Sequence, residues 1–447
     1  MLLIKNGHVI DPASGLDSII DILIENGKFA EIAQDIPEST VMGRKTAVTE
    51  AVGALPDNEP LKIIDASGLL VLPGLVDTHS HFRDPGFPLK EDIGSGAAAA
   101  AKGGYTSIVM MANTRPPIDN TDVLNDVLEK GRRTPVHIYC CANVTRGMEG
   151  LELTCFEELK EAGAVGFTDD GKPIMNAALL KLAFEKAAGL DVPVSLHEED
   201  PAFVHGAGVN AGSAAARALG IKGADRQAEI SMVKRDLDIA LETGANVVIQ
   251  HISAAESVEL VRRAKVRASG GSDRIHAEAS PHHFSLTEDA VLRFGTNAKC
   301  NPPLRTEADR QAIIEGLADG TIDIIATDHA PHTAEEKAKP FMEAPSGMTG
   351  LETAFSLGLK ELVNTKKLAL IDFVRLMTQS PADLYHLPAG RITVGAAADL
   401  AIIDAEATWT VGPGFASRSS NSPFVAETLP GVIRYTIAGG KAIFIST

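Results

Sequence analysis

From about residue 70 onward, short apolar runs alternate with stretches of helical character, and this alternation constrains the fold more than any other feature. Strand-like runs separated by helices imply parallel pairing. Eight such runs predict a (β/α)8 TIM barrel, and a doubly wound open sheet remains the alternative. The apolar runs span residues 69–76, 106–111, 136–142, 164–167, 192–196, 246–249, 274–279 and 322–326, and the helical stretches include 97–102, 176–188, 227–243 and 309–318.

Both ends of the chain show a different pattern, made of short strands and turns. Asn-Gly pairs at 6–7 and 26–27 are typical hairpin signals. We expect the two ends to pair into one small β domain beside the barrel. The short runs lie at 2–4 and 19–24 near the start, and at 400–403, 432–437 and 442–445 near the end.

These patterns predict a division of the chain into three segments. Residues 1–68 and 389–447 form the two parts of the small β domain, and residues 69–388 form the barrel. Residues 41–62 are polar and punctuated by Pro and Gly, so we expect a loop or a hairpin excursion there.

Seven of the eight apolar runs end in polar side chains suited to chemistry. In a parallel barrel all of these ends emerge at the same face, where active sites lie. Their convergence is therefore a stronger signal than any single motif. In chain order they carry Asp77, His79, His81 and Arg83; Asn113; Asp169 and Asp170; His197; His251; His282 and His283; and Asp328, His329 and His332.

The histidines and acids among these residues predict a metal centre. His79 and His81 are two residues apart, so on a strand their imidazoles point to the same side. Together with His197, His251 and Asp328 they exceed what one tetrahedral zinc needs. Two metals would use them all if an anionic oxygen bridged the pair. Asp169 and Asp170 are the candidates for the bridge, and strand period alone does not decide between them.

Such a centre predicts hydrolytic chemistry at a carbonyl group. A water held by two divalent cations loses a proton near neutral pH. Asp328 would carry that proton to the departing nitrogen as general base and then general acid. Arg83 suits bidentate capture of a substrate carboxylate, with a surface salt bridge as the alternative. Asn113 and Asn301 are candidate amide contacts, and either His329 or His332 could contact substrate.

Charge and cysteine content exclude several other classes of protein. Lys and Arg total 41 against 59 Asp and Glu, a net charge of −18, and no basic cluster provides a nucleic-acid footprint. No apolar run reaches the roughly 20 residues that a membrane span needs, and the N-terminus does not read as a signal peptide. The four cysteines, Cys140, Cys141, Cys155 and Cys300, fit reduced thiols in a cytoplasmic protein.

Taken together, the sequence resembles the amidohydrolase superfamily, and within it the class I dihydroorotases that bridge their metals with an aspartate. The resemblance covers essentially the whole chain, and the motifs are jointly very specific. Residues 395–404, GAAADLAIID, are similar to the small composite β-sandwich domain of the superfamily. The motifs are DTHSHFRDPG at 77–86, FTDDG at 167–171, HIS at 251–253, EASPHH at 278–283, NPPLR at 301–305 and ATDHAPH at 326–332.

This resemblance implies a role for each matching residue. One metal would be bound by His79, His81 and Asp328, and the other by His197 and His251, with Asp170 bridging. Arg83, Asn113 and His332 would hold the substrate carboxylate, and Asn301 would lie near the dihydropyrimidine ring. Ala112 departs from the family, which usually has Pro before the Asn.

The resemblance also implies an activity, a metal and partners. The reaction would be the reversible cyclisation of N-carbamoyl-L-aspartate to L-dihydroorotate in pyrimidine biosynthesis, with two Zn²⁺ per chain. A homodimer and a complex with aspartate transcarbamoylase are both compatible with it. The alternatives are a hydantoinase-like or allantoinase-like cyclic-amide hydrolase and a non-catalytic scaffold. Residues 331–347, rich in Pro and Gly, are a candidate lid.

Overall fold

The computed structural model describes residues 1–39, 41, 62–268 and 274–446. Residues 42–61, the body of the predicted excursion, lie outside the described part of the chain. The described elements form two sheets of eight strands each, one parallel and one mixed. Within the described ranges, no helix has the length and apolar character needed to cross a membrane.

The parallel sheet is the predicted barrel, with its strands side by side in chain order from β6 to β13. The ends of the sheet meet where Ser80 bridges His329, and His81 N donates to His329 O at 2.8 Å. This closure excludes the open doubly wound sheet. The strands are β6 (Leu75–Ser80), β7 (Tyr105–Met110), β8 (His137–Ala142), β9 (Gly166–Thr168), β10 (Val194–Leu196), β11 (Val247–Ile249), β12 (Ile275–Ala279) and β13 (Ile324–Ile325).

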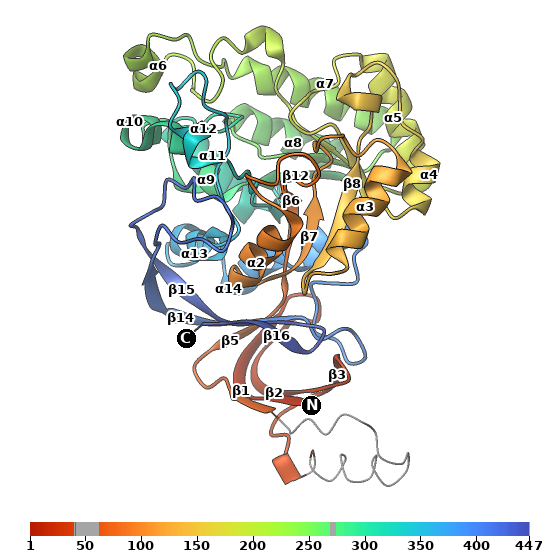
Figure 1. Cartoon of the computed structure of the whole chain (residues 1–447), viewed down its shortest axis with the longest axis vertical. Helices are drawn as coiled ribbons and strands as arrows, with labels where there is room; N and C mark the ends of the chain where they lie inside the picture. The colour runs from red at the N-terminus through yellow and green to blue at the C-terminus, as the bar shows by residue number, and fades with distance from the viewer. Residues whose placement is uncertain (40, 42–61, 269–273, 447) are drawn as a thin grey trace.

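Helices follow the barrel strands in turn and cover the outside of the barrel (Figure 1). The helices predicted at 97–102, 176–188, 227–243 and 309–318 are all confirmed, as α2, α5, α7 and α11. The α-helices are α2 (Ile93–Lys102), α3 (Thr121–Gly131), α4 (Phe156–Glu161), α5 (Ala177–Leu190), α6 (Ala214–Leu219), α7 (Gln227–Thr243), α8 (Ala255–Arg267), α9 (Pro281–Ser285), α10 (Ala290–Phe294), α11 (Glu307–Ala318), α12 (Ala334–Lys337), α13 (Ala354–Gly358), α14 (Leu370–Met377) and α15 (Gln379–Leu384). Shorter turns are η1 (Arg146–Met148), η2 (Pro201–Phe203), η3 (Gly295–Ala298) and the π-helical η4 (Leu359–Val363).

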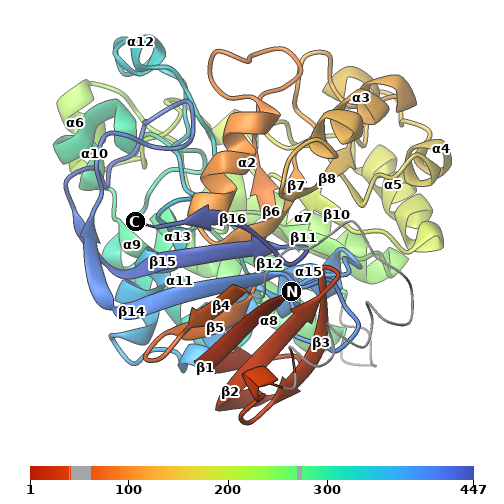
Figure 2. The same cartoon turned by 60° about the horizontal axis from the view of Figure 1, so that its bottom comes forward.

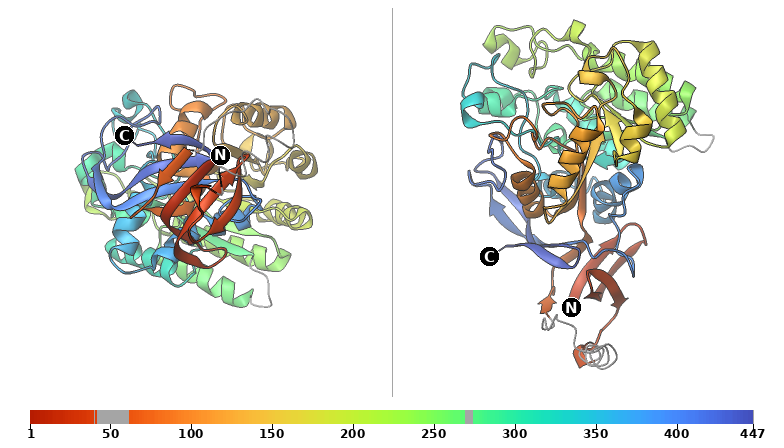
Figure 3. Two further views of the ribbon diagram at one scale, coloured as in Figure 1. Left: turned by 90° about the horizontal axis from the view of Figure 1, so that it is seen from below. Right: turned by 45° about the vertical axis from the view of Figure 1, so that its right-hand side comes forward.

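The mixed sheet joins the two ends of the chain, as predicted. Its order is β16-β15-β14-β5-β1-β2-β3, with β4 paired to β1. Strands β14–β16 lie between the barrel and the N-terminal strands, as Figure 2 shows with the bottom of the molecule brought forward and the left panel of Figure 3 shows from below. The strands are β1 (Leu2–Asp11), β2 (Leu16–Glu25), β3 (Lys28–Ala33), β4 (Lys62–Asp65), β5 (Leu70–Pro73), β14 (Leu400–Thr410), β15 (Thr428–Ala438) and β16 (Lys441–Ile445).

Two local features differ from the sequence expectation. The run predicted as one strand at 69–76 is divided, because β5 pairs with β1 and β14 whereas β6 opens the barrel. Gly74 separates them, and a Cβ there would lie 2.1 Å from Thr106 Oγ1. The Asn6-Gly7 pair is a bulge inside β1, whereas Asn26-Gly27, with φ of 51° and 76°, makes the predicted turn between β2 and β3. The domain division at 68/69 and 388/389 stays a prediction.

Candidate metal centre and active-site cavity

The end of β6 brings two imidazoles into the mouth of the barrel. His79 is the penultimate residue of β6 and fully buried, and His81 follows the strand. His79 Nε2 lies 3.6 Å from an oxygen of Asp170 and 3.6 Å from an oxygen of Asp328. His81 Nε2 lies 3.4 Å and 3.2 Å from the same two carboxylates. The structure therefore brings these four predicted residues together.

His197 and His251 face the same aspartate from the other side. Nδ1 of His197 and Nε2 of His251 lie 3.0 Å apart, and both approach Asp170 Oδ1, at 3.6 Å and 3.8 Å. Asp170 consequently belongs to two groups of metal-ligand atoms, one with His79 and His81 and one with His197 and His251. Within each group, the ligand atoms lie within 4.8 Å of one another.

The neighbouring acids and histidines turn away from this centre. Asp169 accepts hydrogen bonds from the backbone of Val144 and Thr145, at 2.9 Å and 3.2 Å. His329 packs outward, contacting Glu91 at 3.3 Å and accepting from Gly350 N at 3.2 Å. In each pair of adjacent residues, therefore, one side chain faces the centre and the other turns away from it.

Burial and charge set the protonation of the central carboxylate. Burial raises the pKa of Asp170, but the His79 charge and the hydrogen bonds from His197 and His251 outweigh it. The pKa therefore lies well below its usual value, and Asp170 is ionised at neutral pH. An ionised carboxylate facing four imidazoles is the donor set that divalent transition metals prefer. His79 Nε2 is buried without a hydrogen-bond partner and points into this set, which fits a metal ligand.

Three of the site residues hold unusual backbone conformations. Arg83, His251 and Asp328 have positive φ angles of 58°, 32° and 46°. Such angles are strained for residues other than glycine and cluster at functional sites. All three residues line the cavity at the ends of the barrel strands.

Glu278 and Asn113 hold the metal-ligand imidazoles in place. Glu278 is buried on β12, contacts His79 Nδ1 and accepts from His251 N at 3.2 Å. Asn113 contacts His81 Nδ1 at 2.9 Å and donates to Asp170 at 3.0 Å. Glu278 was not among the residues predicted for the site. The sequence does contain a signal for this residue, because Glu278 is a carboxylate within a run that is otherwise suited to a buried strand.

The centre opens into a cavity of about 200 Å³. Besides the metal-ligand candidates other than His79, all four predicted substrate residues line it, and so do Ser346 and Gly347 at the end of the segment predicted as a lid. The lining residues are His81, Arg83, Asn113, Asp170, Gly171, His197, His251, Asn301, Asp328, Ala330, His332, Ser346 and Gly347.

Arg83 presents a positive charge to this cavity. Its guanidinium contacts Pro331 O at 3.3 Å and His332 Nε2 at 3.4 Å, and it pairs with no carboxylate among the described residues. The alternative of a surface salt bridge is therefore wrong. Burial and the charges of Arg83 and Lys90 lower the pKa of His332 to about 2, so this histidine is neutral. A partly buried guanidinium without a counter-ion is suited to bind an anionic group.

Two lysines fasten the segment predicted as a lid. Lys299 Nζ donates to the carbonyls of Phe341 and Ala344, at 2.7 Å and 2.6 Å. Lys337 Nζ donates to those of Pro345 and Gly347, at 3.0 Å and 2.9 Å. These contacts hold the cavity-lining backbone at residues 346–347 in place, and movement of 331–347 as a lid stays a prediction.

Comparison with known proteins places the chain in a family. Residues 70–443 match the model of the amidohydrolase family, and the chain belongs to that family of metal-dependent enzymes. Its branch within the family is that of the dihydroorotases. The chain is 50% identical over 444 residues to the dihydroorotase of Clostridioides difficile (strain 630), covering 99% of this chain and 100% of that one. It is 47% identical to the dihydroorotase of Lactococcus lactis subsp. lactis (strain IL1403), covering 99% of both.

Solved structures show the same fold. The L-hydantoinase (dihydropyrimidinase) from Arthrobacter aurescens superposes with a TM-score of 0.82 at 25% identity, over 100% of this chain and 97% of that one. A dihydropyrimidinase from Brevibacillus agri NCHU1002 superposes with a TM-score of 0.81 at 19% identity, over 99% and 95%. The TIM barrel with a terminal β domain is thus confirmed.

Proposed function

We propose that this chain catalyses the reversible cyclisation of N-carbamoyl-L-aspartate to L-dihydroorotate, in the direction of ring closure in the cell. The main support is the active-site cavity, which is lined both by the imidazoles and carboxylates suited to bind metals and by the guanidinium of Arg83. A dihydropyrimidine ring bearing a carboxylate matches this cavity, because its amide group can face the metal-ligand cluster while its carboxylate pairs with Arg83. Full-length identity of 46–50% to dihydroorotases supports the same reaction.

We propose two Zn²⁺ ions as the resident metals. His79, His81 and Asp328 would hold one ion, His197 and His251 the other, and Asp170 both. When bound, two such cations lower the pKa of water and polarise a carbonyl group. Zinc suits a histidine-rich ligand set without cysteine. The shared position of Asp170 between the two ligand groups supports the bridging role.

Asp328 would move the proton. Burial raises its pKa, but the hydrogen bond from His81 and the charges of His79 and His251 outweigh it, so the pKa lies below its usual value. The ionised carboxylate can accept a proton from the attacking water as the water oxygen bonds to the ring carbonyl carbon. It then returns that proton to the ring nitrogen as the C–N bond breaks, and ring closure is the reverse.

The polar residues around the cavity would orient the substrate. Arg83, Asn113 and His332 would hold the ring carboxylate, and Asn301 would face the ring. Ser346 Oγ donates to Asn301 Oδ1 at 3.1 Å, which leaves the Asn301 amide N–H groups for a carbonyl oxygen.

A substrate panel tests this function. Zinc-loaded protein should open the L-dihydroorotate ring, and the loss of ultraviolet absorbance by the substrate measures this reaction. A chelator should abolish the activity. Hydantoin, dihydrouracil and allantoin should react far more slowly. Faster turnover of one of these rings would indicate a hydantoinase-like or allantoinase-like hydrolase. No turnover of any ring would favour the scaffold, and aspartate transcarbamoylase would then be added.

The variant Arg83→Met sharpens the panel. Losing a charged hydrogen bond of about 2 kcal/mol should lower kcat/KM for dihydroorotate about 30-fold. Dihydrouracil, which lacks the carboxylate, should be little affected. An equal loss on both rings would remove Arg83 from carboxylate binding.

Glu278→Gln tests the support of His79. The amide keeps the size of the side chain but removes the charge that faces His79 Nδ1. Loss of such a partner should weaken metal binding about 10–100-fold. Competition with a chromophoric chelator measures this affinity, and excess zinc should restore most of the activity. Unchanged affinity would contradict the supporting role.

We also propose a cytoplasmic location and binding of the small-molecule substrate without nucleic acid or membrane. A homodimer and docking onto aspartate transcarbamoylase remain proposals for the assembly. Size-exclusion chromatography coupled to light scattering, with and without that partner, distinguishes them.

A further inference from the structure

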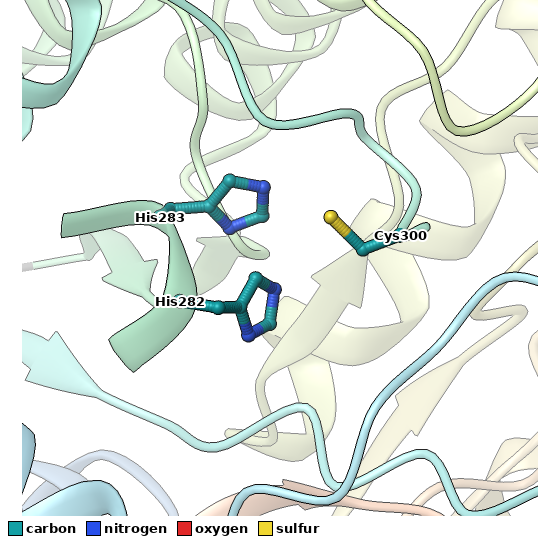
Figure 4. A group of neighbouring side chains, drawn as sticks. All are labelled: His282, His283 and Cys300. Carbon is teal, nitrogen blue, oxygen red and sulfur yellow. The ribbon is translucent and has the colours of Figure 1, made fainter. Parts of the chain in front are cut away.

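A second kind of metal-ligand cluster lies behind the active-site cavity. His282 and His283 open helix α9, directly after β12, and Cys300 lies on the loop after η3. Figure 4 shows both imidazoles and the Cys300 sulfur directed into one space. One ligand atom from each residue lies within 4.8 Å of the others. All three side chains are buried, with exposed fractions of 2%, 3% and 0%.

The two imidazoles each have a nitrogen without a partner. His282 Nε2 and His283 Nδ1 are buried and make no hydrogen bond to any residue that the structure describes. Such unsatisfied polar atoms are uncommon inside proteins and destabilising. Adjacent residues on a helix normally face different directions, yet these two rings lie 4.4 Å apart between centroids. The chain therefore places side by side two imidazoles that each keep one nitrogen free for a ligand.

The surroundings hold the imidazoles in the form that binds metals. His283 Nε2 lies 3.0 Å from Pro302 O, so this nitrogen carries the proton and Nδ1 keeps its lone pair. Burial lowers the pKa of His282 to about 4 and also lowers the pKa of His283, so both rings are neutral at pH 7.

Cys300 completes the set as a sulfur ligand. Burial raises the pKa of its thiol to about 12, while a hydrogen bond from the Leu304 backbone opposes that rise. A bound cation would displace the thiol proton, as metals do at cysteine ligands. Asn301, the next residue, lines the catalytic cavity.

We propose that His282, His283 and Cys300 bind one transition-metal cation of borderline softness, such as Zn²⁺ or Co²⁺, in addition to the metals of the catalytic centre. Two imidazoles and a thiolate are a ligand set for such ions. The catalytic centre offers only nitrogen and oxygen ligands, so the two sites differ in chemistry. This inference is independent of the proposed reaction.

Cobalt distinguishes the two sites. Metal-free protein titrated with Co²⁺ should develop a thiolate-to-cobalt charge-transfer band in the near ultraviolet, because only the new site supplies sulfur. Cys300→Ser should lose the band and bind one metal equivalent fewer than the unsubstituted protein, measured by elemental mass spectrometry. Cys300→Ala provides a second small substitution, and far-ultraviolet circular dichroism checks the folding of both.

Two other cysteines provide matched controls. Cys141 is buried on β8 and Cys155 is partly exposed. Cys141→Ala and Cys155→Ser should both keep the band and the additional metal equivalent. No band in the unsubstituted protein, or a band that persists in Cys300→Ser, would overturn the proposal.

Discussion

Asp328→Asn should abolish most turnover while leaving much of the bound metal in place. Oδ1 of Asp328 lies 3.6 Å from His79 Nε2 and 3.2 Å from His81 Nε2. The amide of the variant keeps an oxygen that can occupy the same position. It can neither accept the proton of the attacking water nor return it to the ring nitrogen. General acid–base catalysis contributes about 10²–10⁴-fold, so we expect kcat to fall about 10³-fold.

The measurement pairs kcat for dihydroorotate with metal content in the same sample. Asp372, a surface carboxylate on α14 that pairs with Arg375 at 2.9 Å, serves as the control. Asp372→Asn should leave both readouts unchanged. Turnover of Asp328→Asn close to that of the unsubstituted protein would remove Asp328 from the acid–base role. Complete loss of metal would make it chiefly a ligand.

The barrel and the convergence of its polar strand ends were predictable because both depend on local patterns. Alternating strands and helices predict parallel pairing, and parallel strands end at one face. His79, His81, His197, His251 and Asp328 each follow or end an apolar run, and the structure brings them together. Their roles as metal ligands remain a prediction.

Other features depend on contacts between distant segments and were not predictable from local pattern. Period-two alternation allowed either Asp169 or Asp170 to face inward, and the backbone groups of Val144 and Thr145 decide which one does. Likewise, β5 leaves the barrel because β1 and β14 pair with it, and both partner strands lie outside residues 69–76. The group of His282, His283 and Cys300 forms only when the loop after η3 folds onto α9.

Asp170→Asn should cause the largest loss of metal of any single substitution at the site. Its carboxylate faces His79, His197 and His251 through one oxygen, at 3.6–3.8 Å, and His81 through the other at 3.4 Å. Replacing it by a neutral amide removes negative charge that both cations would share. We expect occupancy of the catalytic centre to fall below about one ion per chain, and kcat/KM to fall more than about 10³-fold.

Asp169→Asn, the same change one residue earlier, separates this role from structural support. Asp169 accepts hydrogen bonds from the backbone of Val144 and Thr145. Their loss should lower the free energy of unfolding by about 1–3 kcal/mol, and with it the thermal midpoint. The metal content should stay intact. Metal loss in Asp170→Asn but not in Asp169→Asn would support the bridging role. Equal metal content in both variants would contradict it, because the four histidines would then hold the cations without a shared carboxylate.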